Sequence, residues 1–524
     1  MSRFNYSYII EKNIKIENPI SNNIPNIKDT KENKNQEILN KLEFRNKISY
    51  LLIAFTFGLS SVIDLAIQFF FKDVLQVQPA DVSKLISIYM IPWLIKLIFG
   101  LLTDTFPIYG YRRKFYIIIC GVLDCFSLIL ISFIKQSTFL FVSCLFIHNS
   151  CLSFLTVLGE AIVVELSHIK NNELENKNIK EKSSKAKNYV SYFFFCKNIG
   201  VLISSFFKGV LLKYLKFSTI FIIASFVPLT FIISGVILVE EKINYRNQND
   251  IKSECPKKFK ESDPINSNDC TKVTENGLIT ENKKICKGKF CLFLFQKRIF
   301  IPILYIIFLT SMPRYNDQMF YFYSGTLHLD SVDLGIISIL TNLAMLGSIL
   351  FYRFFLKKKS FRKIVTWSVT IGFILSFLSY VLVTRYNIKL GISDFPFVVL
   401  SSCLFTIITE FIMLPFISLA AILSPQNYEG TTFAIFLSSI NLGIIISNLN
   451  ASFLTNLLNI TTKDLSNLPK LILISNFLAL LPLPFLCCIK KTYFEPSHNE
   501  DQYSSEIDEL KDKKEFETKS MNEI

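Results

Sequence analysis

The chain has 524 residues, of which 51% are hydrophobic, and its formal net charge is +14. A soluble protein of this length would need about three or four domains. Here the apolar residues instead form uninterrupted runs of roughly 20 or more, enough to cross about 30 Å of hydrocarbon. The composition excludes a soluble multidomain protein and places the chain in a lipid bilayer. Its positive charge reflects membrane topology rather than nucleic-acid binding.

Polar segments divide the chain into five parts. Residues 1–47 lack a signal-peptide pattern and predict a disordered cytosolic tail, with an organellar targeting sequence as the alternative. Residues 240–298 predict a cytosolic linker, and residues 490–524 predict a second disordered cytosolic tail. The two hydrophobic parts between them are 48–239 and 299–489.

Each hydrophobic part contains six apolar runs. We predict a helix for every run, because a helix satisfies its own backbone hydrogen bonds in lipid. The runs are 48–71, 85–103, 115–134, 138–166, 189–212 and 217–239, followed by 299–323, 334–352, 364–383, 397–424, 430–458 and 470–489. The sequence therefore predicts an all-α membrane protein with twelve transmembrane helices in two six-helix bundles, a division typical of carriers with two parallel halves.

The loops between these runs differ in their Lys and Arg content. Basic residues cluster after the second run, at Arg112, Arg113 and Lys114, and after the eighth run, at 353–363, whereas the loop 324–333 has none. Since basic loops stay on the cytosolic side, both termini are predicted to be cytosolic. We expect the plasma membrane as the location, with an organelle membrane as the alternative.

Charged side chains inside the runs are the main functional candidates, because burying a charge in hydrocarbon is costly. We predict that six of them line a cavity and bind substrate or protons: Asp64, Lys96, Glu160, Lys197, Arg314 and Asp317. Arg314 and Asp317 are three residues apart, which predicts one shared helix face. The alternative is a set of structural ion pairs. This structural interpretation is favoured for charges near run ends, and His148 is interpreted as a satisfied core residue; the end charges are Glu165, Lys208 and Asp333.

A short polar loop joins the second and third runs. Gly100 and Asp104 precede it, and the basic pair Arg112–Arg113 follows within a few residues. A glycine lets helices approach each other, and an aspartate can cap a helix or pair with arginines, so such a loop can hold one of two states. We predict that Gly100, Asp104, Arg112 and Arg113 gate the cytosolic side.

The twelve cysteines predict neither a disulfide framework nor a metal site. Most lie in apolar runs, where cysteine acts as a small apolar residue. The four in the linker, Cys255, Cys270, Cys286 and Cys291, lack the two close pairs that zinc sites need. No metal and no cofactor is therefore expected.

The most specific motif lies between residues 92 and 113. It reads Pro92-Trp93-x-x-Lys96, then Gly100-Leu-Leu-x-Asp104-x-Phe-Pro-Ile-x-Gly110-Tyr-Arg112-Arg113. This pattern resembles the folate–biopterin transporter family of the major facilitator superfamily, in its apicomplexan type. The resemblance extends over roughly 50–240 and 298–490 and includes Pro313, Asp317 and Phe320-Tyr321-Phe322. The chain departs from the family at Thr156 and Ser402, where an acid is usual, and at Lys197, where arginine is usual; Glu410 could replace the acid missing at Ser402.

The resemblance implies a major facilitator fold and a secondary active transporter of folates or pterins, coupled to protons and working by alternating access. Carboxylates can bind the amino group of a pterin, and Lys or Arg can bind the carboxylates of a glutamate tail. On this interpretation Asp64 and Glu160 hold the pterin or the proton, whereas Lys96, Lys197 and Arg314 bind anionic groups. Asp104, Arg112 and Arg113 form the cytosolic latch.

Three other functions stay open at this point. The first is a carrier of another solute, such as S-adenosylmethionine or a drug, on the same fold. The second is a non-transporting membrane receptor or scaffold whose function lies in the loop 240–298. The third, a membrane-embedded enzyme, is disfavoured because no nucleophile–base pairing or metal-ligand spacing is visible.

Overall fold

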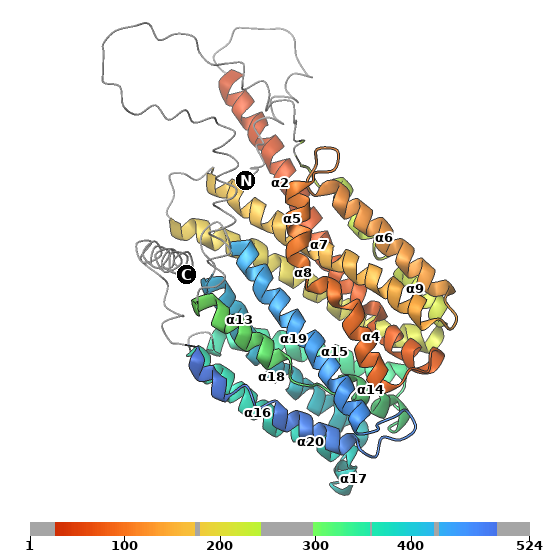
Figure 1. Cartoon of the computed structure of the whole chain (residues 1–524). Coiled ribbons are helices and arrows are strands. Elements are labelled where there is room, and N and C mark those ends of the chain that lie inside the picture. The colour runs from red at the N-terminus through yellow and green to blue at the C-terminus, as the bar shows by residue number, and fades with distance from the viewer. Residues whose placement is uncertain are drawn as a thin grey trace, which may run out of the picture.

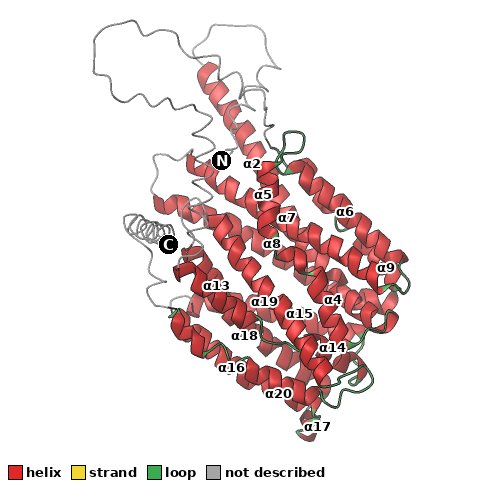
Figure 2. Cartoon of the chain, in the orientation of Figure 1, coloured by secondary structure: helices red, strands yellow, loops and turns green. Residues whose placement is uncertain are grey.

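The computed structural model describes residues 27–172, 179–240, 242, 297–356, 359–423 and 429–489. The side chains of 27–40, 104, 164–172, 179–191, 297–298, 421–423, 429–433 and 488 are not among those described. The predicted linker and C-terminal tail lie almost wholly outside these ranges. Every regular element within them is helical (Figure 2).

The N-terminal bundle is built from the first six predicted spans (Figure 1). Its elements are α2 (Ile27–Leu59), η1 (Ser60–Ile63), α3 (Asp64–Phe69), η2 (Phe70–Val74), α4 (Pro79–Tyr89), η3 (Ile91–Trp93), α5 (Lys96–Thr105), α6 (Lys114–Phe133), α7 (Thr138–Asn172), α8 (Ile179–Tyr214), α9 (Phe217–Ala224) and α10 (Leu229–Ile237).

The C-terminal bundle contains the other six spans. Its elements are α13 (Lys297–Thr310), α14 (Asn316–Gly325), α15 (Ser331–Phe351), η4 (Tyr352–Leu356), α16 (Phe361–Val383), the short α17 (Tyr386–Lys389), α18 (Asp394–Leu423), α19 (Glu429–Leu457), α20 (Leu468–Leu478) and η5 (Pro484–Cys488).

Nine helices in the described ranges are long and apolar enough to cross a membrane, and they match nine of the twelve predicted runs. The other three runs, 85–103, 299–323 and 470–489, are broken into helices too short to cross a membrane, whereas the run 217–239 contains a turn at 225–228 but still counts as one span. Each break lies at or beside a proline, which removes a backbone donor and clashes with the preceding turn. The prolines are Pro92, Pro313 and Pro482. The run lengths were therefore predicted correctly, but the continuity of these three helices was not.

The seventh span shows the consequence most clearly. Helix α13 ends at Thr310 and α14 begins at Asn316, so Arg314 lies in the linker and Asp317 in the first turn of α14. The prediction that these two charges share one helix face is therefore wrong.

The first helix begins earlier than predicted. Helix α2 starts at Ile27, so the last part of the segment predicted as a disordered tail is helical. The side chain of Asn46 fixes this segment to the end of α10, donating to the Val239 carbonyl at 3.0 Å and accepting from its N–H at 2.9 Å. The ion pair between Lys47 and Glu43, at 2.9 Å, adds support within the helix.

The hydrophobic core is divided unequally between the two ends of the molecule. We call the end that carries the Arg112–Arg113 loop the basic end. At the opposite end one cluster joins both bundles, with Phe71, Phe141 and Phe221 on one side and Phe320 and Leu471 on the other. At the basic end the two bundles have separate clusters, one within 50–238 and one within 299–489. Among the described residues, the two bundles therefore share a hydrophobic core at the opposite end and have separate cores at the basic end.

Candidate functional site

Helix α8 lies between the two bundles and packs closely against one helix from each of them. Within the N-terminal bundle it crosses α2. A Cβ atom added to Gly200 would collide with the carbonyl oxygen of Phe55, and one added to Gly58 would collide with that of Lys197. Only glycine therefore permits this crossing. One turn further on, the hydroxyls of Ser61 and Ser204 are 2.5 Å apart.

The second neighbour of α8 is α15, from the other bundle. A Cβ atom on Gly335 would lie 2.8 Å from the Cα atom of Gly209, which brings the two backbones into contact. Nearby, the Asn342 amide donates to the Ser205 hydroxyl at 2.6 Å. Helix α8 therefore joins the two bundles, and both of its crossings depend on small residues.

Two lysines of α8 point between these crossings. Lys197 and Lys208 are eleven residues apart, so at 100° per residue they lie within about 20° of each other on the helix. Gly200 and Ser204 lie to one side of that direction and Ser205 and Gly209 to the other. The rise of 1.5 Å per residue separates the two lysines by about 16 Å along the axis.

The charged group nearer the basic end is here called the lysine cluster, and consists of Lys96, Glu160, Lys197 and Glu410. The Lys96 ammonium lies 3.7 Å from a Glu160 carboxylate oxygen and is buried. Lys197 lies 4.6 Å above the ring of Phe57 and interacts electrostatically with the other three members. Since Glu410 belongs to α18, both bundles contribute to the cluster.

The break before α5 positions Lys96. The carbonyls that the break leaves free are satisfied from two helices: Ser153 donates to Pro92 at 3.0 Å, and Asn441 donates to Trp93 at 3.3 Å. The Trp93 ring lies 5.1 Å from the Lys96 ammonium. The predicted motif Pro92-Trp93-x-x-Lys96 therefore forms a bend that is held by two hydrogen bonds and places Lys96 in the lysine cluster.

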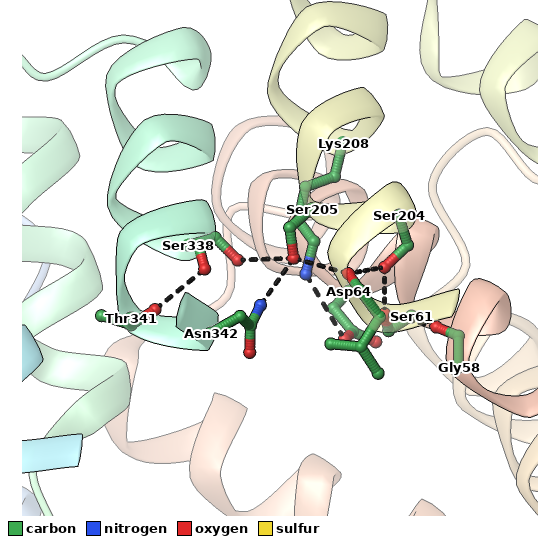
Figure 3. A network of polar contacts seen from close by, with 10 residues as sticks. Gly58, Ser61, Asp64, Ser204, Ser205, Lys208, Ser338, Thr341 and Asn342 are labelled. Carbon is green, nitrogen blue, oxygen red and sulfur yellow. Dashed lines mark hydrogen bonds and ion pairs between the residues drawn. The ribbon is translucent and has the colours of Figure 1, made fainter. Parts of the chain in front are cut away.

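Asp64 lies apart from this cluster, beside Lys208. A carboxylate oxygen of Asp64 is 3.9 Å from the Lys208 ammonium (Figure 3). The Asp64 side chain is 62% exposed in a segment that is otherwise apolar, whereas that of Lys208 is 9% exposed. Lys208 was interpreted from sequence as a structural residue near a helix end, yet it is the charged partner of a predicted site residue.

Asp317 lies at the opposite end of the molecule. Its carboxylate accepts a hydrogen bond from Ser83 of α4 at 2.6 Å. Two more contacts cross between the bundles here: Lys72 donates to Ser324 at 2.7 Å and Tyr321 donates to the Val77 carbonyl at 2.6 Å. We call these three contacts the opposite-end gate. Asp317 is thus grouped with contacts that hold the bundles together, not with the lysine cluster.

Arg314 is half-buried in the linker between α13 and α14. Among the residues that the structure describes, it makes neither a hydrogen bond nor an ion pair.

At the basic end, one carboxylate caps the helix that follows the Arg112–Arg113 loop. Glu240, at the end of the sixth span, accepts backbone N–H bonds from Arg112, Arg113 and Lys114 at 3.0, 3.0 and 3.1 Å. An anion at this position also compensates the helix dipole. The loop itself turns at Tyr109 and Gly110, which have φ values of 52° and 85°.

The gating role of Gly100, Asp104, Arg112 and Arg113 stays a prediction. The side chain of Asp104 lies outside those described. A Cβ atom on Gly100 would meet only Val157, at an ordinary 3.6 Å, so the expected close approach at Gly100 is not present. The backbone contacts of Arg112 and Arg113 given above stay within the N-terminal bundle. The latch between bundles stays a prediction.

We expect Glu240→Gln to lower the free energy of unfolding by about 0.5–2 kcal/mol, as for other lost helix caps. The amide can accept fewer N–H bonds and no longer opposes the dipole. A thermal unfolding scan in detergent measures the effect. Asp81→Asn is the matched control, because Asp81 forms an exposed pair with Lys84 that contributes little. Equal unfolding temperatures for the two variants would contradict the capping role.

His148 lies inside the N-terminal bundle. Its Nδ1 atom is 2.5 Å from a carboxylate oxygen of Asp124, and both side chains are buried. This geometry agrees with its interpretation as a satisfied core residue.

Sequence reasoning did not connect Lys208 with Asp64, Glu240 with the Arg112–Arg113 loop, or Asn342 with α8. Lys208 shares a helix face with Lys197, and that spacing was the one available signal. Nothing in the sequence indicated that Glu240 reaches the Arg112–Arg113 loop or that Asn342 reaches α8.

The fold is shared with solved transporters. The chain matches the POT family transporter PepTSo with a TM-score of 0.59 at 12% identity, covering 86% of this chain and 98% of that one. The nucleoside transporter NupG matches with a TM-score of 0.56 at 12% identity, over 86% and 99%. The D-xylose-proton symporter matches with a TM-score of 0.56 at 13% identity, over 88% and 99%. These similarities confirm the predicted major facilitator fold.

Sequence comparison is more specific. The chain is 30% identical over 458 residues to Folate transporter 1 of Plasmodium falciparum, covering 87% of this chain and 80% of that protein. It is 28% identical over 445 residues to the Folate-biopterin transporter of Synechocystis, covering 84% and 80%. The model of the BT1 family matches residues 58–507. The predicted resemblance is confirmed, and the chain belongs to the BT1 family.

Proposed function

We propose that this protein is a secondary active transporter of folates or pterins that works by alternating access. Its relatives in Plasmodium falciparum and Synechocystis are named Folate transporter 1 and Folate-biopterin transporter. The observation that carries the proposal is the distribution of the hydrophobic core. The two bundles share one cluster at the opposite end and have a separate cluster each at the basic end. A carrier in one of its two states has this arrangement, because substrate must reach a central site from one side only.

The orientation and location belong to the proposal. The basic end would face the cytosol, by the positive-inside rule, with both termini on that side and the protein in the plasma membrane. The opposite-end gate would then separate the central site from the exterior, and the described state would be open towards the cytosol.

The lysine cluster suits an anionic substrate. The ammonium groups of Lys96 and Lys197 lie close enough to interact electrostatically. An ammonium binds a carboxylate through a charge-assisted hydrogen bond. The Glu160 carboxylate competes for Lys96, which lies 3.7 Å away. If Glu160 takes up a proton, that competition ends and Lys96 is free for the substrate. Proton uptake and substrate binding would in this way favour each other, which is the basis of symport.

The test is uptake of labelled folate into liposomes that contain the purified protein, with and without an inward proton gradient. We expect the gradient to accelerate uptake by the wild type. In Glu160→Gln the amide is permanently neutral, so uptake should lose its response to the gradient while exchange of folate continues. Asp81→Asn, in the exposed pair with Lys84, is the matched control.

The outcomes separate the open functions. A folded wild-type protein that moves no folate, but moves S-adenosylmethionine or another solute, would replace the substrate and keep the carrier. A protein that transports no solute, and whose cellular function is abolished by deletion of 240–298 but not by Glu160→Gln, would be a receptor or scaffold. An unchanged gradient response in Glu160→Gln would remove Glu160 from proton coupling.

A further inference from the structure

A buried lysine without a hydrogen bond lies where the two bundles meet near Asp64. The Lys208 side chain is 9% exposed, and its nearest charged partner, the Asp64 carboxylate, is 3.9 Å away. That distance is too long for a hydrogen bond. In the described part of the chain, Lys208 makes no hydrogen bond at all. The three N–H donors of the Lys208 ammonium are therefore available to a further acceptor.

The other bundle adds a polar group to the same place. The amide nitrogen of Asn342 donates to Ser205 at 2.6 Å, which directs the side chain of Asn342 toward α8. Its amide oxygen has no hydrogen-bond partner among the described residues. Figure 3 shows Asp64 and Asn342 reaching α8 from two sides, with the Lys208 ammonium between them. One ammonium group and two side chains with acceptor oxygens therefore lie along this part of α8, and each acceptor comes from a different bundle.

We propose that Asp64, Lys208 and Asn342 form a subsite for a planar heterocycle whose edge places N–H donors next to a carbonyl oxygen. The Lys208 ammonium donates to the carbonyl oxygen. The Asp64 carboxylate and the Asn342 amide oxygen accept from the N–H groups. A pterin ring has this edge, so the inference rests on the proposed function and assigns one end of the substrate within it.

The lysine cluster would hold the other end. Lys208 and Lys197 share a face of α8 and are separated by about 16 Å along its axis. An elongated substrate with a ring at one end and carboxylates at the other matches this arrangement. Both groups are balanced in charge, so they differ in the donors they offer. The ring subsite has one ammonium group and two acceptor side chains, whereas the lysine cluster has two ammonium groups for the carboxylates of the substrate.

The subsite also differs from a simple structural ion pair. A structural pair would be buried on both sides and in hydrogen-bond contact. Here the carboxylate is 62% exposed and the contact is long. The glycines at 209 and 335 already hold α8 against α15 without any contribution from Lys208.

Competition binding tests the assignment. The purified full-length protein binds labelled folate, which is displaced either by biopterin, a probe with the ring alone, or by p-aminobenzoylglutamate, a probe with the tail alone. We expect Lys208→Met to weaken biopterin about tenfold or more, the loss typical of a charge-assisted hydrogen bond, and to leave p-aminobenzoylglutamate within about twofold. Lys96→Met, in the lysine cluster, is the matched variant and should show the reverse pattern.

Asn342→Leu repeats the comparison without changing any charge, and serves if Lys208→Met does not fold. It should weaken biopterin selectively, by a smaller factor than Lys208→Met. Equal weakening of both probes by Lys208→Met or Asn342→Leu, or of neither, would overturn the subsite. A wild-type protein that binds no folate at all would instead refute the proposed function.

Discussion

Replacing Gly335 with leucine is expected to lower substrate uptake about fivefold or more while the protein stays folded. A Cβ atom at this position would lie 2.8 Å from the Cα atom of Gly209, and the obstacle is backbone rather than a flexible side chain. Helices α8 and α15 must therefore separate. Overpacking of this kind costs about 1–3 kcal/mol, enough to shift a two-state equilibrium by roughly 5- to 150-fold.

The separation should favour the state that is open at the opposite end. The contact between α8 and α15 belongs to the described state, and each bundle keeps a core of its own at the basic end. The leucine would penalise one state of the transport cycle without dismantling either bundle. Uptake into liposomes measures the loss. Hydrogen–deuterium exchange of α4 and α14, which carry Ser83 and Asp317 of the opposite-end gate, should become faster.

Gly347→Leu is the matched control. It lies in the same helix, α15, and a Cβ atom there would meet no atom within 4 Å. Wild-type uptake by Gly335→Leu would show that the contact of α8 with α15 does not distinguish the two states. Loss of uptake with unchanged exchange in α4 and α14 would show that the substitution acts in some other way.

Most of the fold was accessible from sequence, because membrane helices are specified by the length of their apolar runs. The length of an apolar run does not show whether the helix is broken within it. Pro92 and Pro313 lie in runs that remain apolar, so hydropathy alone reports one helix where the structure has two. The same breaks place Lys96 and Arg314, which is why the details nearest the site were predicted least well.

The site shows a similar limit. The cost of burying charge drew attention to Asp64, Lys96, Glu160 and Lys197, and the structure places the last three in one cluster. Helical periodicity, however, gives the face of a helix and not the neighbour that faces it. The ion pair of Lys208 with Asp64 joins two helices, and it cannot be derived from the position of Lys208 near a helix end.

Glycine gives the clearest case of this limit. The sequence interpretation assigned a close helix approach to Gly100, which lies in the most specific motif. The structure places the close approaches at Gly58 with Gly200 and at Gly209 with Gly335. Which glycine faces another backbone depends on how two distant segments cross, and that is a property of the tertiary structure.

The second large effect is expected at Lys197. We expect Lys197→Met to lower folate uptake about 10- to 100-fold, the range of one lost charge-assisted hydrogen bond. The lysine cluster pairs two ammonium groups with two carboxylates, and removal of Lys197 leaves an excess of negative charge that repels an anionic substrate. Lys197→Arg keeps the charge and restores the residue usual in the family, so it should retain most of the uptake. Lys213→Met, an exposed lysine of the same helix, is the matched control.

A double variant distinguishes binding from charge balance. Lys197→Met combined with Glu410→Gln returns the cluster to equal numbers of positive and negative groups. If Lys197 binds the substrate, the double variant should regain stability in a thermal unfolding scan but not uptake, because the donor is still missing. If uptake returns to the wild-type rate, Lys197 serves only to balance Glu410, and the carboxylates of the substrate must be held by Lys96 or by Arg314, whose guanidinium has no hydrogen bond or ion pair among the described residues.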